Sequence, residues 1–164
     1  MGRRDAICPR RWPAGSVTTY NSGSRLFVST ANSLPFFNLG LRPNLLSGDI
    51  RSGVSMSEYD PNDPARNSYL LRSAFVNPAA GSYGNAPRAL EVRGPMNLNE
   101  SFALIKSTTI RERVTHQLRM EMQNPFNRTV FGNPITDFTS AAFGRISGAQ
   151  MGPRNIQVGM KVIF

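Results

Sequence analysis

The sequence ends in Asn155-Ile-Gln-Val-Gly-Met-Lys-Val-Ile-Phe164, where apolar residues recur at every second position. Successive side chains of an extended strand point to opposite faces, so this period of two separates the stretch into two surfaces. The apolar surface consists of Ile156, Val158, Met160, Val162 and Phe164. A tilted strand of about ten residues is long enough to cross a bilayer. The pattern therefore predicts a membrane-spanning strand over 155–164.

A second stretch, 115–124, alternates in the same way. Its apolar residues do not recur at the spacings of three and four that an amphipathic helix requires. One predicted face carries His116, Leu118, Met120 and Met122, and the other carries Gln117, Arg119, Glu121 and Gln123. We expect the first face to meet lipid and the second to face a polar lumen, as in transmembrane barrels. On this placement, His116 lies near a membrane interface, and Arg119 and Glu121 project into the same lumen.

Two further stretches have strand character. Residues 96–107 place Leu98, Phe102 and Leu104 on one face, which Glu100 and Lys106 interrupt. Residues 16–30 contain apolar and β-branched runs, 17–20 and 26–28, on either side of an Asn-Ser-Gly turn signal. Four predicted strands are fewer than the roughly eight of the smallest single-chain barrels.

The remaining segments, 31–95 and 125–154, are rich in Gly, Pro and Asn and show no sustained period. A short charged link, 108–114, joins the strands at 96–107 and 115–124, whereas the loop at 125–154 is long. Outer-membrane barrels have short periplasmic turns and long extracellular loops. The predicted fold is therefore all-β. It consists of the last strands of an antiparallel transmembrane β-barrel with long extracellular loops, and it is incomplete on its own because an open sheet edge cannot face lipid.

Composition narrows the possible functions. The formal net charge is +9, and the only lysines are Lys106 and Lys161. Since Cys8 and His116 are the only residues of their kinds, we expect no internal disulfide, no histidine-based metal site and no catalytic triad. The segment 60–63 offers oxygen ligands of the calcium type, but its prolines favour an ordinary turn. We expect neither enzymatic activity nor a cofactor.

Several segments resemble, in the same order, the end of Oar-like TonB-dependent transporters, a carboxypeptidase-regulatory-like-domain receptor family. Residues 111–134, RERVTHQLRMEMQNPFNRTVFGNP, resemble the penultimate strand and the loop that follows it. Residues 143–164, FGRISGAQMGPRNIQVGMKVIF, resemble the terminal strand. Shorter matches upstream are Tyr20-Asn-Ser-Gly23, Asn32-Ser-Leu-Pro35, Arg42-Pro-Asn44, Tyr83-Gly-Asn-Ala-Pro-Arg88 and Arg93-Gly-Pro95. The resemblance covers roughly 16–164, and 1–15 form a non-matching extension.

The resemblance implies a C-terminal segment of a receptor barrel in the cell outer membrane, with the rest of the barrel and a plug as partners. It also implies that the barrel-assembly machinery recognises the terminal strand through Phe164. TonB would act only through an N-terminal part of the receptor. Residues 1–15 contain several arginines and prolines but no apolar run like that of a signal peptide, so we expect a fragment of a longer gene.

Two other classes of protein remain as alternatives. The chain could be one subunit of an oligomeric outer-membrane barrel to which several copies contribute strands. It could instead be a soluble, arginine-rich nucleic-acid-binding protein, with strongly salt-dependent binding. The scattered arginines and the two alternating stretches argue against nucleic acid as a partner, and they favour outer-membrane lipid.

Overall fold

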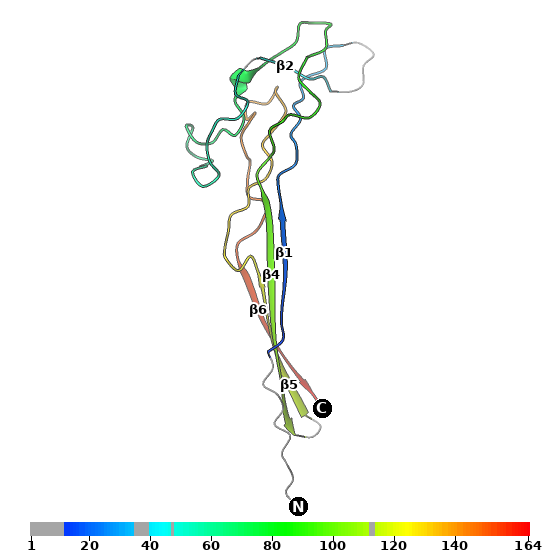
Figure 1. Cartoon of the computed structure of the whole chain (residues 1–164), viewed down its shortest axis with the longest axis vertical. Coiled ribbons are helices and arrows are strands. Elements are labelled where there is room, and N and C mark those ends of the chain that lie inside the picture. The colour runs from blue at the N-terminus through cyan, green and yellow to red at the C-terminus, as the bar shows by residue number, and fades with distance from the viewer. Residues whose placement is uncertain (1–11, 35–39, 47, 112–113) are drawn as a thin grey trace, which may run out of the picture. The chain divides into compact units, whose positions relative to one another are not determined.

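The computed structural model describes residues 12–34, 40–46, 48–111 and 114–164. In chain order the elements are β1 (Ala14–Asn21), β2 (Asn44–Leu45), the 3-10 helix η1 (Arg72–Ala74), β3 (Phe75–Val76), β4 (Asn97–Arg111), β5 (Val114–Gln123) and β6 (Asn155–Ile163). Figure 1 labels β1, β2, β4, β5 and β6. The chain forms two compact units. One consists of Met1–Tyr20, Leu98–Thr129 and Met151–Phe164, and the other consists of Asn21–Asn97 and Val130–Gln150.

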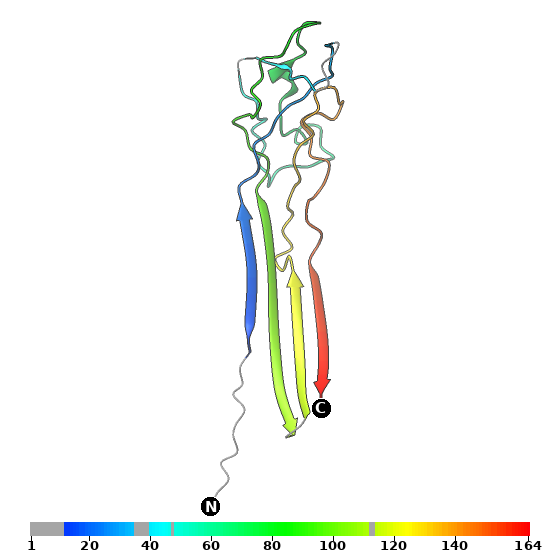
Figure 2. The ribbon, with the colours of Figure 1, turned by 90° about the vertical axis from the view of Figure 1, so that its right-hand side faces the viewer.

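The first unit is a four-stranded sheet in the order β1-β4-β5-β6. Neighbouring strands run in opposite directions, as the arrows in Figure 2 show. Along β4 and β5 the partners include Leu104 and Met120, and along β5 and β6 they include Met120 and Val158. Residues directly opposite each other in an antiparallel sheet project to the same face. The register therefore joins even-numbered residues of three strands on one face and odd-numbered residues on the other.

The structure confirms the predicted fold class. The described elements are strands apart from η1, and the four strands of the sheet do not close into a barrel. Within the described ranges, none of the helical structure is long and apolar enough to cross a membrane. β1 and β6 lie at the two edges of the sheet, and each pairs with one neighbour among the described strands.

The strand at 96–107 is longer than predicted. β4 continues to Arg111, and β5 begins at Val114, so most of the predicted link 108–114 is strand. The pairing shifts by one residue between Thr109 and Arg111, where the ladder is irregular. The charges of this link suggested a turn, but threonines favour an extended backbone and carry the ladder further. Residues 112–113 lie outside the described part of the chain, as do Cys8 and the rest of 1–11.

The second unit has a hydrophobic core that sequence analysis missed. Its segments are mostly irregular, with one short antiparallel pair, β2–β3, and several isolated bridges. They nevertheless bury a shared cluster of apolar side chains, namely Leu26, Val28, Tyr59, Tyr69, Leu70, Ala74, Phe75, Leu90, Phe138, Phe143 and Ile146. The rings of Phe138 and Phe143 meet edge to face with their centroids 5.3 Å apart. The predicted loop 31–95 and residues 130–150 of the predicted loop 125–154 thus belong to one packed body.

The prediction of a strand at 26–28 is wrong. Leu26 and Val28 are 3% and 1% exposed and belong to the core of the second unit, while their neighbours form only single bridges. Alternating burial is common to half-buried strands and to irregular chain that crosses a core. The short apolar run therefore could not distinguish between these two structures.

Backbone contacts between distant segments hold this unit together. The Gly144 carbonyl accepts hydrogen bonds from the N–H groups of Tyr69 and Leu70, at 2.7 and 3.2 Å. Gly144 has a φ of +81°, a conformation that residues with a Cβ rarely adopt, and a Cβ there would collide with the Leu70 carbonyl. The Tyr59 hydroxyl donates to the Asn67 carbonyl at 2.9 Å and accepts from the Ile146 N–H at 2.8 Å. Glycine and tyrosine thus connect 59–70 with 144–146.

Candidate functional site

Most of the even-numbered face of the sheet is apolar. Leu118, Met120 and Met122 lie opposite Met160, Val158 and Ile156, and Leu104 and Phe102 extend the row on β4. The β6 side chains are widely exposed, with Met160 at 71% and Val158 at 62%. Val162 belongs to the same row, and Phe164 follows the end of β6 with 97% of its surface exposed. A contiguous exposed apolar surface of this kind is typical of contact with lipid or with another protein.

The odd-numbered face is polar. Its residues include Gln117, Arg119, Glu121 and Gln123 on β5, opposite Lys161, Gly159, Gln157 and Asn155 on β6. Arg119 and Glu121 form an ion pair of 2.5 Å, and both side chains are well exposed. Exposed pairs of this kind add little stability. The contrast between the two faces was predicted from the alternation, and the strand register extends it across three strands.

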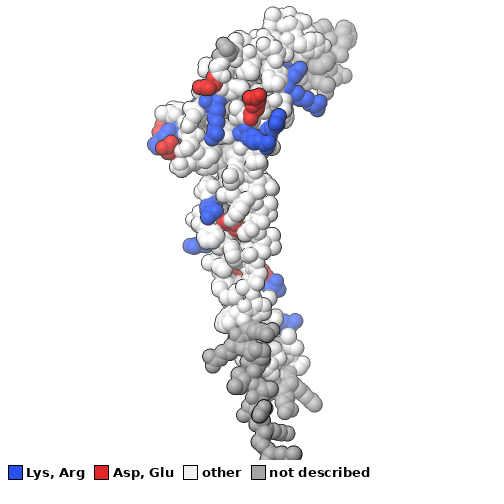
Figure 3. Space-filling model, viewed as in Figure 1, with Lys and Arg blue, Asp and Glu red and all other residues white. Residues whose placement is uncertain are grey.

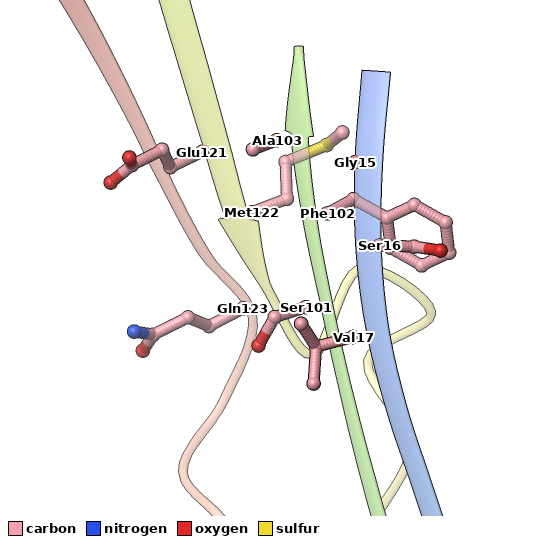
Figure 4. A pocket seen from close by; sticks show the side chains of 9 residues that line it. All are labelled: Gly15, Ser16, Val17, Ser101, Phe102, Ala103, Glu121, Met122 and Gln123. Carbon is pink, nitrogen blue, oxygen red and sulfur yellow. The ribbon is translucent and has the colours of Figure 1, made fainter.

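Figure 4 shows this contrast at one level of the sheet, where Glu121 and Gln123 project to one side and Phe102 to the other. A depression of about 350 Å³ lies here, along β1, β4 and β5. Several of the residues that line it are small, namely Gly15, Ser101 and Ala103. Among the residues that line it, Glu121 is the one ionisable group, so the lining offers no pair of groups for acid–base chemistry.

The position of Glu100 in the sequence suggested an exposed charge on the apolar face, but the structure buries this side chain. It is 3% exposed. The Tyr20 hydroxyl donates a hydrogen bond to Glu100 Oε1, and the Arg128 guanidinium lies 3.2 Å from the same oxygen. A buried carboxylate is costly unless it is paired and hydrogen-bonded, and here it is both. The pairing comes from residue separations of 80 and 28, so strand periodicity could not show it.

A tight turn after β5 brings Arg128 to this carboxylate. Asn124 and Asn127 have φ values of 47° and 50°, a conformation that asparagine tolerates. The Asn124 side chain accepts from the Arg128 N–H at 2.9 Å and donates to the Gly152 carbonyl at 3.1 Å. Phe126 packs edge to face on Phe102, with 6.0 Å between the ring centroids. The turn therefore covers the even face at the end of β5.

Lys106, the other charged residue of the even face in β4, also has an aromatic partner. Its Nζ lies 5.0 Å from the centroid of the Trp12 ring, a cation–π contact. An aromatic side chain thus contacts each charged position of the β4 face, Trp12 at Lys106 and Tyr20 at Glu100. Aromatic residues are enriched at both membrane–water interfaces.

The structure also places the other residues that were weighed as candidates. His116 lies opposite Thr108 and Val162 on the even face. The segment 60–63 forms a turn in which Asp60 accepts from the Asn62 N–H, and Asp63 pairs with Arg66 at 2.7 Å. The hydrogen bond from the Arg66 guanidinium lowers the pKa of Asp63. Within the described part of the chain, no three His, Cys, Asp or Glu residues gather as a metal site would require.

The protein-family model for the outer membrane beta barrel domain matches residues 10–157. No curated protein and no solved structure matches the chain. The matched range includes β1, β4 and β5, and it reaches the first residues of β6.

Replacing Arg128 tests the neutralisation of Glu100. In Arg128→Gln the buried carboxylate keeps only the neutral donor of Tyr20, so we expect the free energy of unfolding to fall by about 1–3 kcal/mol. Urea unfolding of the detergent-solubilised chain measures this change. Arg154→Gln is the control, because it removes an exposed arginine whose backbone N–H donates to Asn127 of the same turn, and whose side chain is in no ion pair with Glu100. In the Glu100→Gln background the loss of Arg128 should cost less. Equal losses in both backgrounds would show that the ion pair contributes nothing.

Proposed function

The chain belongs to the outer membrane beta barrel domain family, and from this premise we propose that it is the C-terminal part of an Oar-like TonB-dependent receptor. In this role it contributes closing strands, external loops and the C-terminal assembly signal. The receptor takes up a substrate across the outer membrane by an energy-coupled mechanism. The segments that resemble the ends of such receptors, 111–134 and 143–164, support this proposal.

One observation carries the proposal most strongly, namely a lipid-like face on a sheet with two open edges. The even-numbered face is apolar across β4, β5 and β6, while β1 and β6 each leave one edge without a described partner strand. In hydrocarbon an unpaired edge would expose N–H and C=O groups that cannot hydrogen-bond to water. Further strands on both sides satisfy these groups. A receptor barrel of about 22 strands, with a plug inside it, provides them.

The strand directions agree with the sidedness of such barrels. β5 ends, and β4 and β6 begin, at the same end of the sheet, because Ser101, Gln123 and Asn155 lie side by side in the register. Figure 2 shows that β1 also ends there. Both long connections therefore leave the sheet at that end, and the short turn between β4 and β5 lies at the other. Long loops are extracellular in bacterial barrels and short turns are periplasmic. We accordingly place 22–96 and 124–154 outside the cell.

The proposed role is structural and not catalytic. The even face contacts lipid, and the odd face, with Gln117, Arg119, Glu121 and Gln123, faces the lumen and the plug. TonB acts through an N-terminal part of the receptor. Nucleic acid is not a proposed partner. On the face that Figure 3 shows, basic side chains lie among acidic ones, whereas nucleic-acid-binding surfaces typically carry a basic stripe.

The second candidate is that the chain serves as one subunit of an oligomeric outer-membrane barrel. The observation that favours it is the pair of open edges at β1 and β6, which could pair with the edges of other copies. The two candidates differ in what the gene encodes. A TonB-dependent receptor requires coding sequence for further strands and a plug upstream of Met1, so sequencing of the upstream DNA tests the proposal. We expect a continuation, in frame or frameshifted, that encodes them. A promoter directly upstream of Met1, with no further coding sequence, would contradict the receptor proposal and favour the oligomeric barrel.

Removing the terminal aromatic side chain tests the proposed assembly signal. An extended segment can add to a sheet edge of a partner through its backbone, with alternate side chains determining the register. In the full receptor, Phe164→Ala should lower the amount of receptor in the outer-membrane fraction severalfold. Ile163→Ala, one position earlier and on the opposite face, is the matched control and should assemble normally. Unchanged outer-membrane levels of Phe164→Ala would contradict the assigned role.

A further inference from the structure

The second unit contains an open pocket that the barrel role does not use. Its volume is about 640 Å³, within the usual range of small-molecule sites. The lining comes from four segments of the same unit, and it consists of Ser22, Gly23, Arg51, Met56, Tyr69, Glu91, Val92, Arg93, Gly94, Pro95 and Met96. The backbones at Gly23 and Gly94 approach so closely that a Cβ on Gly23 would collide with the Gly94 carbonyl. The pocket is thus built around a close contact that requires glycine.

Arg51 is held at this pocket by a buried aromatic ring. Its guanidinium carbon lies 4.9 Å from the centroid of the Tyr69 ring, and its backbone forms a bridge with Leu70. Tyr69 is 2% exposed, and its hydroxyl donates to the Arg93 carbonyl at 2.6 Å. Burial raises the pKa of Tyr69, and the positive charge of Arg51 partly opposes that shift. The ring is therefore a fixed platform that limits the positions of the guanidinium.

Arg93 provides a second guanidinium at the pocket. It donates to the Gly23 carbonyl at 3.2 Å, and its backbone pairs with Arg25 in an isolated bridge. Among the described residues, neither Arg51 nor Arg93 forms an ion pair, whereas Arg66, Arg119 and Arg128 each pair with a carboxylate. A guanidinium offers several N–H donors in a planar fork that matches the geometry of a carboxylate. Both arginines can therefore bind an anionic group of a ligand.

The rest of the lining narrows the ligand class. Met56, Val92 and Pro95 form apolar wall, and methionine adapts readily to different side-chain shapes. Glu91 adds an exposed carboxylate, which accepts hydrogen bonds from N–H groups. A ligand that satisfies all three features carries a carboxylate, an amide N–H and an apolar side chain. These groups occur together at the C-terminal end of a peptide.

We propose that this pocket binds the carboxyl-terminal end of a short apolar peptide. Its carboxylate lies between Arg51 and Arg93, and its amide N–H faces Glu91. Its last side chain contacts the wall of Met56, Val92 and Pro95. Arrival of the peptide from outside the cell rests on the proposed function, but the binding itself depends only on this unit.

Calorimetric titration of the full chain in detergent tests the proposal, with N-acetyl-leucyl-leucine as the probe and its C-terminal amide as the matched neutral ligand. We expect the acid to bind and the amide to bind at least about tenfold more weakly, because charge-assisted hydrogen bonds are lost. Arg51→Gln and Arg93→Gln should each weaken binding of the acid by a similar factor. Arg51→Lys keeps the charge but not the planar fork, so its affinity for the acid should lie between those of wild type and Arg51→Gln.

Arg88→Gln is the control, because it removes an exposed arginine of the same unit that does not line this pocket. It should bind the acid like wild type. Equal affinity for acid and amide, wild-type affinity of both glutamine variants, or no binding of the acid to a folded chain would each overturn the proposal. Normal outer-membrane assembly alongside any of these results would leave the barrel role intact, so the two failures are distinguishable.

Discussion

Antiparallel pairing of β4, β5 and β6 in one register determines which side chains share a surface. Met120 lies opposite both Leu104 and Val158, so one row of apolar side chains crosses three strands without a break. A slip of one residue between two strands would place the polar residues of one beside the apolar residues of the other. The contrast between a lipid-like face and a polar face depends on this register. The chain belongs to the outer membrane beta barrel domain family, and barrels of this kind have one face toward lipid and one toward the lumen.

Two charged residues of the apolar face, Glu100 and Lys106, are each accommodated by a partner side chain. Glu100 is buried beneath Tyr20 and Arg128, and Lys106 lies against the Trp12 ring. Each charge is therefore partnered within the same unit. The turn that carries Arg128 depends on two asparagines in the left-handed conformation, so a local backbone preference supports a long-range ion pair.

The sequence predicted β5 and β6 closely, because strict alternation over about ten residues has few explanations other than a two-faced strand. It did not predict the core of the second unit. Side chains such as Leu70, Leu90 and Phe143 come from irregular segments far apart in the chain and share no period. For the same reason Glu100 suggested an interruption, since its partners Tyr20 and Arg128 are visible only after folding. Periodicity reports a local environment, whereas these contacts depend on tertiary structure.

The central claim is that the even-numbered face of β6 contacts lipid. Spin-label accessibility measures this most directly, with single labels at 155–163 in a Cys8→Ser background, in the protein assembled in lipid bilayers. We predict that accessibility to oxygen, which concentrates in hydrocarbon, peaks at 156, 158, 160 and 162. Accessibility to a water-soluble nickel chelate should peak at the positions between them. Uniform accessibility along the strand, or the same alternation with the two faces exchanged, would contradict this account.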